Sequence, residues 1–198
     1  LDECLVNFVC YKLSCGDGNP EILRLFDSEY ARTSTKPQYE GEDFVLIDNV
    51  ETLKQRFNSF SQEAQSSLRI RQMKIHEGKP EDPGIGIEYA FSNHLFITGG
   101  LNKKNNSIWT VSLILENTDS PADISNFIVA TLCLISSTNP ELNPEERGAI
   151  MNEMGFTDPK NINSEESWTG KTVKNGTQFY IAFLYGRGFI FNIGRPSD

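Results

Sequence analysis

The period of hydrophobic residues changes several times along this chain, and that change constrains the fold more than any other feature. Between residues 48 and 64, apolar residues recur every three or four positions, which is the spacing of one helix face. Asp48 with Glu51 three residues later has the form of a capping box, so a helix is expected to start there. From Leu68 to Leu115 the period is two, in four short runs separated by turns, which predicts half-buried strands.

The second half of the chain repeats this order of elements. Helical spacing with a wide apolar stripe from Asp123 to Ser137 predicts a largely buried helix. Asn143 before Pro144, with Glu146 three residues after the asparagine, is a strong signal for the start of a further helix. Apolar runs of strand type follow these two helices, so the pattern is again helix first and strands second.

Three strands are expected toward the C-terminal end of the sequence. Asn175-Gly176 is the strongest short hairpin signal, and it separates two of these strands. The strands are expected at 168–173, 177–185 and 189–193. No part of the pattern requires the repeated strand–helix–strand units of a parallel sheet. The sequence therefore predicts an α+β fold, a twisted antiparallel sheet of about six to seven strands with helices packed on one face.

Two parts of unequal size are expected in the chain. Residues 1–47 are predicted to form a cysteine-containing helix and loop segment packed on the body, and residues 48–198 to form a single α+β domain. Because a helix followed by hairpins occurs at 48–116 and again at 123–193, the order of elements predicts an internal pseudo-repeat. The residues of the two halves are not similar enough to establish a duplication.

Charge and composition narrow the classes of partner. Lys and Arg number 18, Asp and Glu number 27, and the formal net charge is −9. This charge repels nucleic acid and anionic lipid, so neither is expected as a partner. No apolar run approaches the roughly 20 residues of a membrane span, so none is expected. The chain has only two His and no ligand spacing typical of a metal site, so neither a metal nor a cofactor is expected.

The positions of the cysteines bear on the cellular compartment. Cys4, Cys10 and Cys15 form a cluster early in the sequence, whereas Cys133 lies in the apolar run of the predicted buried helix and is expected to be buried. The cluster is compatible with a disulfide, and equally with reduced thiols that pack as small apolar residues. The sequence begins at Leu1 rather than Met, and together with a disulfide this favours a protein exported to the periplasm or cell surface over a cytoplasmic one.

One part of the sequence resembles a known type of domain. The run from Thr138 to Gly155, followed by the hairpin at residues 173–176, is similar to small uncharacterised bacterial exported or lipoprotein-like domains. The resemblance extends in general order over roughly residues 50–193 and carries no catalytic residues. It implies export and a non-enzymatic role.

A candidate binding site is expected around the Gly-Arg-Gly turn near the end of the sequence. Aromatic residues and an arginine gather at this turn, and these residue types anchor protein interfaces. The candidates are Trp168, Tyr185, Arg187 and Phe189. In the alternative interpretation, Trp168 and Phe189 are core residues and Arg187 only caps the turn.

Acidic clusters in predicted loops form a second candidate surface. They are Glu40, Glu42 and Asp43, then Glu81 and Asp82, then Glu165 and Glu166. If these loops converge, the clusters would attract a basic protein partner and steer its approach.

The leading functional hypothesis is a small acidic exported domain that binds a protein or another macromolecule, as an inhibitor, an immunity protein or a cell-envelope adaptor. The charge, the clustered cysteines and the lack of a catalytic motif in the sequence favour this hypothesis over an enzyme. One alternative is an enzyme whose site is assembled from distant residues, for which the candidates are His76, Glu88 and His94. The other is a carrier of an apolar ligand, with a cavity lined by Phe57, Phe60, Tyr89 and Phe127.

Overall fold

A computed structural model describes residues 44–76, 84–116, 118, 120–162 and 165–196. These residues belong to one compact unit from Phe44 to Pro196. The unit includes Ile47, which pairs with Ile108 through hydrogen bonds in both directions. The rest of the N-terminal segment, with Cys4, Cys10 and Cys15, lies outside the described residues.

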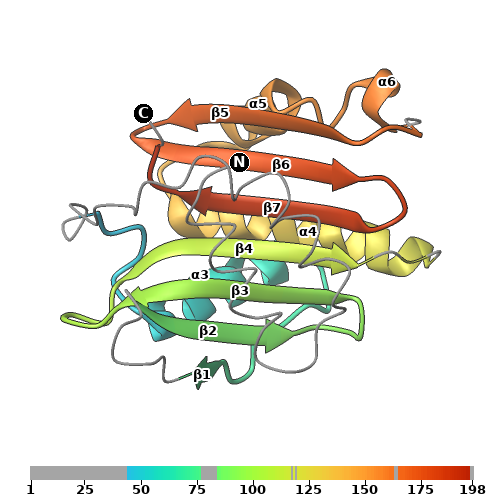
Figure 1. The fold of residues 1–198 in the computed structure, drawn as a ribbon. Coiled ribbons are helices and arrows are strands. Elements are labelled where there is room, and N and C mark those ends of the chain that lie inside the picture. The colour runs from blue at the N-terminus through green and yellow to red at the C-terminus, as the bar shows by residue number, and fades with distance from the viewer. Residues whose placement is uncertain (1–43, 77–83, 117, 119, 163–164, 197–198) are drawn as a thin grey trace, which may run out of the picture. The chain divides into compact units, whose positions relative to one another are not determined.

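The unit is built on one antiparallel sheet, which confirms the predicted α+β class (Figure 1). The sheet has 7 strands in the order β1-β2-β3-β4-β7-β6-β5. Every neighbouring pair is antiparallel. The strands are β1 (Lys74–His76), β2 (Gly84–Ala90), β3 (Leu95–Asn102), β4 (Ile108–Glu116), β5 (Trp168–Lys174), β6 (Thr177–Leu184) and β7 (Gly188–Gly194).

The two halves of the chain meet at the pair formed by β4 and β7 in the centre of the sheet. Val111 lies opposite Ile193, and Ser112 lies opposite Asn192. The Asn192 Nδ2 donates to Ser112 Oγ at 2.9 Å and to Thr110 Oγ1 at 3.0 Å, which ties the side chains of the two strands together. The two halves differ in their elements, because only the first half contains a strand like β1 and only the second contains two additional helices before its strands. The pseudo-repeat therefore stays a prediction.

Two long helices, α3 (Val50–Glu63) and α4 (Pro121–Thr138), lie behind the sheet in Figure 1 and pack on each other, and α4 also packs on β4. The helix α3 begins one residue later than the predicted capping box requires, because the Asn49 side chain accepts from Thr52 N at 2.8 Å and acts as the cap. Asn and Asp serve this purpose about equally well. The Ser120 side chain caps α4 in the same way by accepting from Asp123 N.

The sequence signal at Asn143 is confirmed by the helix α5 (Pro144–Glu153). Asn143 Oδ1 accepts from Glu146 N at 2.9 Å, and Glu146 Oε2 accepts from Asn143 N at 2.9 Å. Both bonds of a capping box are therefore present. A short helix, α6 (Pro159–Ile162), follows before β5.

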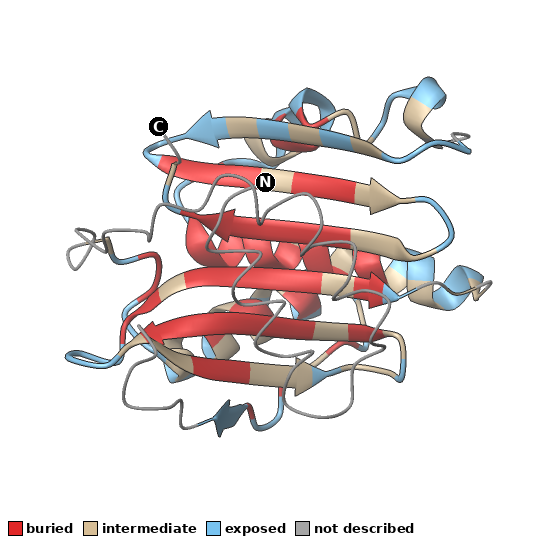
Figure 2. Cartoon of the chain, viewed as in Figure 1, coloured by how far each residue is buried: buried red, intermediate tan, exposed pale blue. Residues whose placement is uncertain are grey.

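The core lies between the helices and the sheet, where alternate strand residues point at α3 and α4. Figure 2 shows that β3, β4, β6 and β7 are mostly buried, whereas β1 and β5 are the most exposed strands. Full burial of one Phe side chain stabilises the fold by about 1.5–3 kcal/mol. The largest fully buried side chains are aromatic and belong to both halves, namely Phe57, Phe127, Phe179 and Phe191.

The helix α4 is long and apolar enough to cross a membrane by length and composition alone. Half of it is buried inside the unit, where it packs on α3 and β4. Cys133 on this helix is buried and free, as the sequence predicts. Helix α4 therefore has the surroundings of a core helix of the domain.

The strand expected from Leu68 onward is shorter than the alternation predicts, because only β1 pairs with the sheet. The preceding segment is bound by side chains of other elements instead. Ile70 N donates to Asn58 Oδ1 at 2.8 Å, and Asn58 Nδ2 donates to Ile70 O at 2.9 Å. The Tyr89 hydroxyl donates to Arg69 O at 2.7 Å. The alternation of buried and exposed residues in this segment therefore arises from its packing on α3 and not from pairing with a neighbouring strand.

Candidate functional site

Two of the four predicted binding residues, Trp168 and Phe189, lie in a cluster of aromatic rings between the sheet and the helices. Phe189 is at its centre, with ring centroids 4.8 Å from Phe183, 5.4 Å from Phe127, 6.2 Å from Phe156 and 6.4 Å from Trp168. Trp168 and Phe189 are half-buried. Their packing fits the alternative in which they are core residues, and it gives the surface above them a rigid base.

Tyr185 is the predicted binding residue that faces solvent, with 57% of its surface exposed. It lies in the turn between β6 and β7. Its backbone N–H donates to Ser167 Oγ at 3.0 Å, and the Arg187 N–H donates to Leu184 O at 2.8 Å across the turn. Gly186 has a φ of 71°, a conformation that favours glycine. The turn is thus held by its own hydrogen bonds and by one to the residue before β5.

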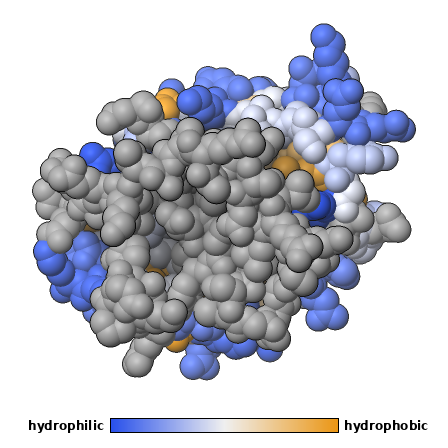
Figure 3. All heavy atoms as spheres, viewed as in Figure 1, coloured by the Kyte–Doolittle hydropathy of each residue, from blue (hydrophilic) through white to orange (hydrophobic). Residues whose placement is uncertain are grey.

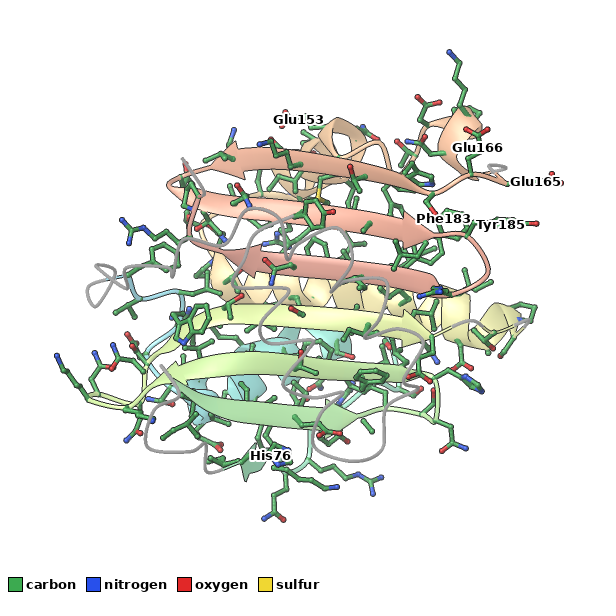
Figure 4. All side chains as sticks on the ribbon, in the orientation of Figure 1. His76, Glu153, Glu165, Glu166, Phe183 and Tyr185 are labelled. Atoms are coloured by element: carbon green, nitrogen blue, oxygen red, sulfur yellow. The ribbon has the colours of Figure 1, made fainter. Side chains whose placement is uncertain are left out.

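We call the end of the sheet that carries Trp168, Phe183, Tyr185 and Phe189 the aromatic end. Figure 4 shows Phe183 and Tyr185 together at the end of β6. In Figure 3 an apolar area lies at this end beside hydrophilic residues. The half-buried Arg187 contributes its backbone N–H to the turn.

Further apolar and acidic side chains border the aromatic end. On α4, the exposed Ile124 and Ile128 flank Phe127, whose ring contacts Phe189. Glu165 and Glu166 are exposed just before β5 and project at the same end of the molecule (Figure 4). The acidic clusters at residues 40–43 and 81–82 lie outside the described residues, so their convergence with Glu165 and Glu166 stays a prediction.

The residues proposed for an enzyme site are brought together only in part. His76 Nε2 and Glu88 Oε2 are 3.1 Å apart across β1 and β2, with the His76 side chain largely exposed. His94 lies in the loop after β2, four residues before Thr98, which is the partner of Glu88 on β3. At the rise of an antiparallel strand, this spacing is about 13 Å. The loop histidine therefore lies apart from the pair formed by His76 and Glu88.

The four side chains expected to line an apolar cavity each contact another side chain among the described residues, and two of them share Phe91. The buried Phe57 stacks on Phe91 at 5.4 Å, and Tyr89 meets Phe91 edge-on at 5.0 Å. Phe60 lies under the Arg147 guanidinium at 4.9 Å. Phe127, on α4, belongs to the cluster of rings around Phe189.

The described part of the chain offers few residues that could bind a metal ion or act as a thiol nucleophile. Within residues 44–196, less the gaps given above, no three His, Cys, Asp or Glu side chains are grouped to hold a metal ion. Burial raises the pKa of the Cys133 thiol to about 12. At neutral pH this thiol is therefore protonated and a poor nucleophile.

Phe183 is the part of the aromatic end that the sequence analysis missed, although a signal for it exists. The two-residue loop Asn175-Gly176 pairs Lys174 with Thr177, and the ladder that follows places Trp168 opposite Phe183. A hairpin loop of this length fixes the register, so the pair follows from the sequence. The helical spacing from Asp123 to Ser137 predicts that Ile124 and Ile128 lie on the buried face, and only the packed structure shows that they are exposed.

Comparison of the chain with protein-family models, with curated proteins and with solved structures finds no match.

Proposed function

We propose that this protein is a small acidic exported binding module that holds a protein partner on its aromatic end. Inhibitor, immunity and cell-envelope adaptor roles are all of this type. One observation carries the proposal: Tyr185 is a large aromatic side chain, 57% exposed, on a turn whose backbone N–H groups donate to Leu184 O and to Ser167 Oγ. Exposed Tyr is among the residue types that dominate binding energy at protein interfaces.

The rigidity of the turn supports this role. A partner that covers the Tyr185 ring buries apolar surface. Because hydrogen bonds already hold the turn, binding loses little conformational entropy there. At the two ends of the turn, the rings of Phe183 and Phe189 pack on each other at 4.8 Å. The apolar side chains of Ile124 and Ile128 add surface of the same kind on α4.

Charge adds a preference for a basic partner. Glu165 and Glu166 are exposed at the same end as Tyr185, and the chain has a net charge of −9. Acidic side chains at the rim of an interface speed the association of a positively charged partner and make the rate depend on salt. The contact itself is expected to depend on the aromatic side chain.

A photo-crosslinking experiment tests the proposal. A benzophenone amino acid is placed at position 185 in the full-length protein and irradiated in cells of the source organism. The matched control carries the same amino acid at Ile75, which has the same exposed fraction of 57% on β1 at the opposite edge of the sheet. We expect a discrete protein adduct from position 185 that position 75 does not give. The same adducts from both positions, or none from position 185, would contradict the proposal.

Once the crosslinked partner is purified, substitutions distinguish the contribution of Tyr185 to affinity from the contribution of the acidic residues to the association rate. Tyr185→Ala is expected to weaken binding at least about tenfold, which corresponds to about 1.4 kcal/mol. Tyr185→Phe retains the ring and should stay close to the wild-type affinity. The double change Glu165→Gln with Glu166→Gln should slow association and reduce its salt dependence, with a smaller effect on dissociation.

The exported part of the proposal has its own test. Intact mass is measured after alkylation of the natural protein, without and with a reductant. Two or more cysteines that react only after reduction show a disulfide, as expected for an oxidising compartment. Reaction of every accessible thiol without reductant would remove the main support for export.

A further inference from the structure

The two edges of the sheet are not equivalent in the described structure. At one edge β1 pairs with β2 over three residues, Lys74↔Glu88, Ile75↔Ile87 and His76↔Gly86. At the other edge the sheet order ends at β5, and no strand in the described part of the chain pairs with its outer side. The first edge shows how a short extended segment lies on this sheet, and the second presents seven residues without such a segment.

The hairpin register identifies which backbone groups of β5 point outward. In a hairpin with a two-residue loop, the closing pair, here Lys174 and Thr177, exchanges both hydrogen bonds. Hydrogen-bonded pairs then alternate with pairs whose N–H and C=O point away from the partner strand. The outward groups therefore belong to Thr169, Lys171 and Val173. All three residues are exposed, Val173 by 53%.

The strand β5 is already held in its extended form by contacts on its helix side. Trp168 Nε1 donates to Asn161 O at 3.1 Å, and the Thr172 hydroxyl donates to the Glu153 carboxylate at the end of α5. The backbone of α5 comes so close that a Cβ at Gly170 would lie 1.9 Å from Met154 O. A segment that pairs with this edge therefore meets a preformed strand, which lowers the entropic cost of pairing.

Charge indicates the chemistry of the segment that fits this edge. Lys171 and Lys174 are exposed and β5 contains no acidic residue, although the net charge of the chain is −9. Opposite charges that face each other across paired strands stabilise the pair, and like charges destabilise it. When two copies of β5 pair antiparallel about Lys171, two lysines face each other, so lysine on an edge strand discourages self-association. The edge favours an acidic strand from another protein.

We propose that the outer edge of β5 accepts an extended acidic segment of a protein partner as an additional strand of the sheet. The segment pairs with the N–H and C=O groups of Thr169, Lys171 and Val173, and it places a carboxylate opposite Lys171. This inference specifies a second contact for the proposed binding function and rests on that function only in requiring a protein partner.

Synthetic peptides serve as the probe. The first is a nine-residue peptide of alternating Val and Thr with two central Glu and no Pro. The second has Lys in place of both Glu, and the third has the Glu sequence with all its peptide nitrogens methylated, which removes the N–H donors from both edges of the peptide. Binding is measured by amide chemical shifts and hydrogen exchange of the full chain. We expect protection of the amides at 169, 171 and 173 by the Glu peptide, and little by the other two.

Variants of β5 connect the binding to the edge. Val173→Pro removes one outward N–H at a position where an edge strand tolerates proline, and Val173→Thr is the matched control. We expect Val173→Pro to lower the affinity for the Glu peptide about tenfold, and Val173→Thr to leave it near the wild-type value. Lys171→Glu should reverse the preference between the Glu and Lys peptides, whereas Lys171→Arg should preserve it.

Several results would overturn the inference. One is a lack of protection at the three outward amides at millimolar Glu peptide. Others are equal binding of the methylated peptide, or no effect of Val173→Pro in a variant whose circular dichroism is unchanged. Protection that rises with protein concentration in the absence of peptide would assign the edge to a second copy instead. Tyr185→Ala, which tests the aromatic end, should leave peptide binding at β5 unchanged, so the two proposals can fail separately.

Discussion

Replacing glycine with alanine at two positions of this protein is predicted to change stability in opposite directions. Gly170 lies on β5 against the end of α5, where an added Cβ would be 1.9 Å from Met154 O and 2.6 Å from Met154 C. Gly148 lies inside α5, and an added Cβ there would have no atom within 4 Å. The chemical change is the same at both positions, so each variant controls for the other.

The magnitude for Gly170→Ala follows from the contact. Ordinary van der Waals contact for a Cβ begins near 3.4 Å, so the Met154 carbonyl would have to retreat by about 1.5 Å from its 1.9 Å separation. The Met154 atoms in this contact belong to its backbone, at the end of α5, so they cannot rotate away as the end of a flexible side chain can. Forced shifts of this kind in packed regions cost about 1–3 kcal/mol.

For Gly148→Ala the expected effect is a gain in stability. Alanine is favoured over glycine in a helix interior by about 0.8–1.0 kcal/mol. The two variants should therefore differ by roughly 2–4 kcal/mol. In a domain of this size, each kcal/mol shifts Tm by roughly 2–4 °C.

Urea unfolding of the full-length protein, followed by circular dichroism and by Trp fluorescence, measures both values. The midpoint should fall for Gly170→Ala and rise for Gly148→Ala, with similar slopes against urea. A Gly170→Ala variant as stable as the wild type would show that α5 does not press on β5 as described. The claim that β5 is held in place from its helix side would then fail as well.

Three further outcomes are expected. Asn143→Ala should destabilise the domain by about 1 kcal/mol because it removes the α5 cap, measured by urea unfolding; no loss would contradict the capping role. Asn58→Ala should lower the free energy of unfolding by about 1–3 kcal/mol and speed hydrogen exchange at the Ile70 amide, because the Ile70 N–H and C=O both lose their partner. Unchanged exchange at this amide would refute the role of Asn58. Burial raises the pKa of Cys133 from 9.0 to about 12, so the unfolded chain loses this proton first and stability should fall between pH 9 and 12; a Cys133→Ala variant that keeps the full slope would refute the assignment.

Local patterns account for the parts of this fold that the sequence predicts well. The helix start at Asn143 depends on residues within four positions, and the structure forms the predicted helix with both bonds of a capping box. Asn175-Gly176 determines the β5–β6 register, because a two-residue loop leaves one way to align the flanking strands. The alternation from residue 84 to 115 also became the expected strands.

Features that depend on distant contacts were harder to predict. The alternation around Ile70 resembles a strand, yet its hydrogen bonds go to Asn58 on α3, a partner that no local pattern identifies. Tyr185 and Phe189 are aromatic residues four positions apart, and only tertiary packing makes one exposed and the other half-buried. The candidate residues were therefore named from the sequence, but their division into a surface anchor and its support required the structure.

The placement of β7 beside β4 has a consequence for how the chain folds during synthesis. The centre of the sheet consists of β4 and the last strand, whose Phe191 and Ile193 are fully buried. While the ribosome still holds residues 188–194, β4 has only β3 beside it and its other edge is unpaired. A nascent chain must keep this apolar edge from associating with other chains until β7 has emerged from the ribosome. Pairing across so long a stretch of sequence also makes folding slow, so the yield of soluble protein should respond to chaperone supply.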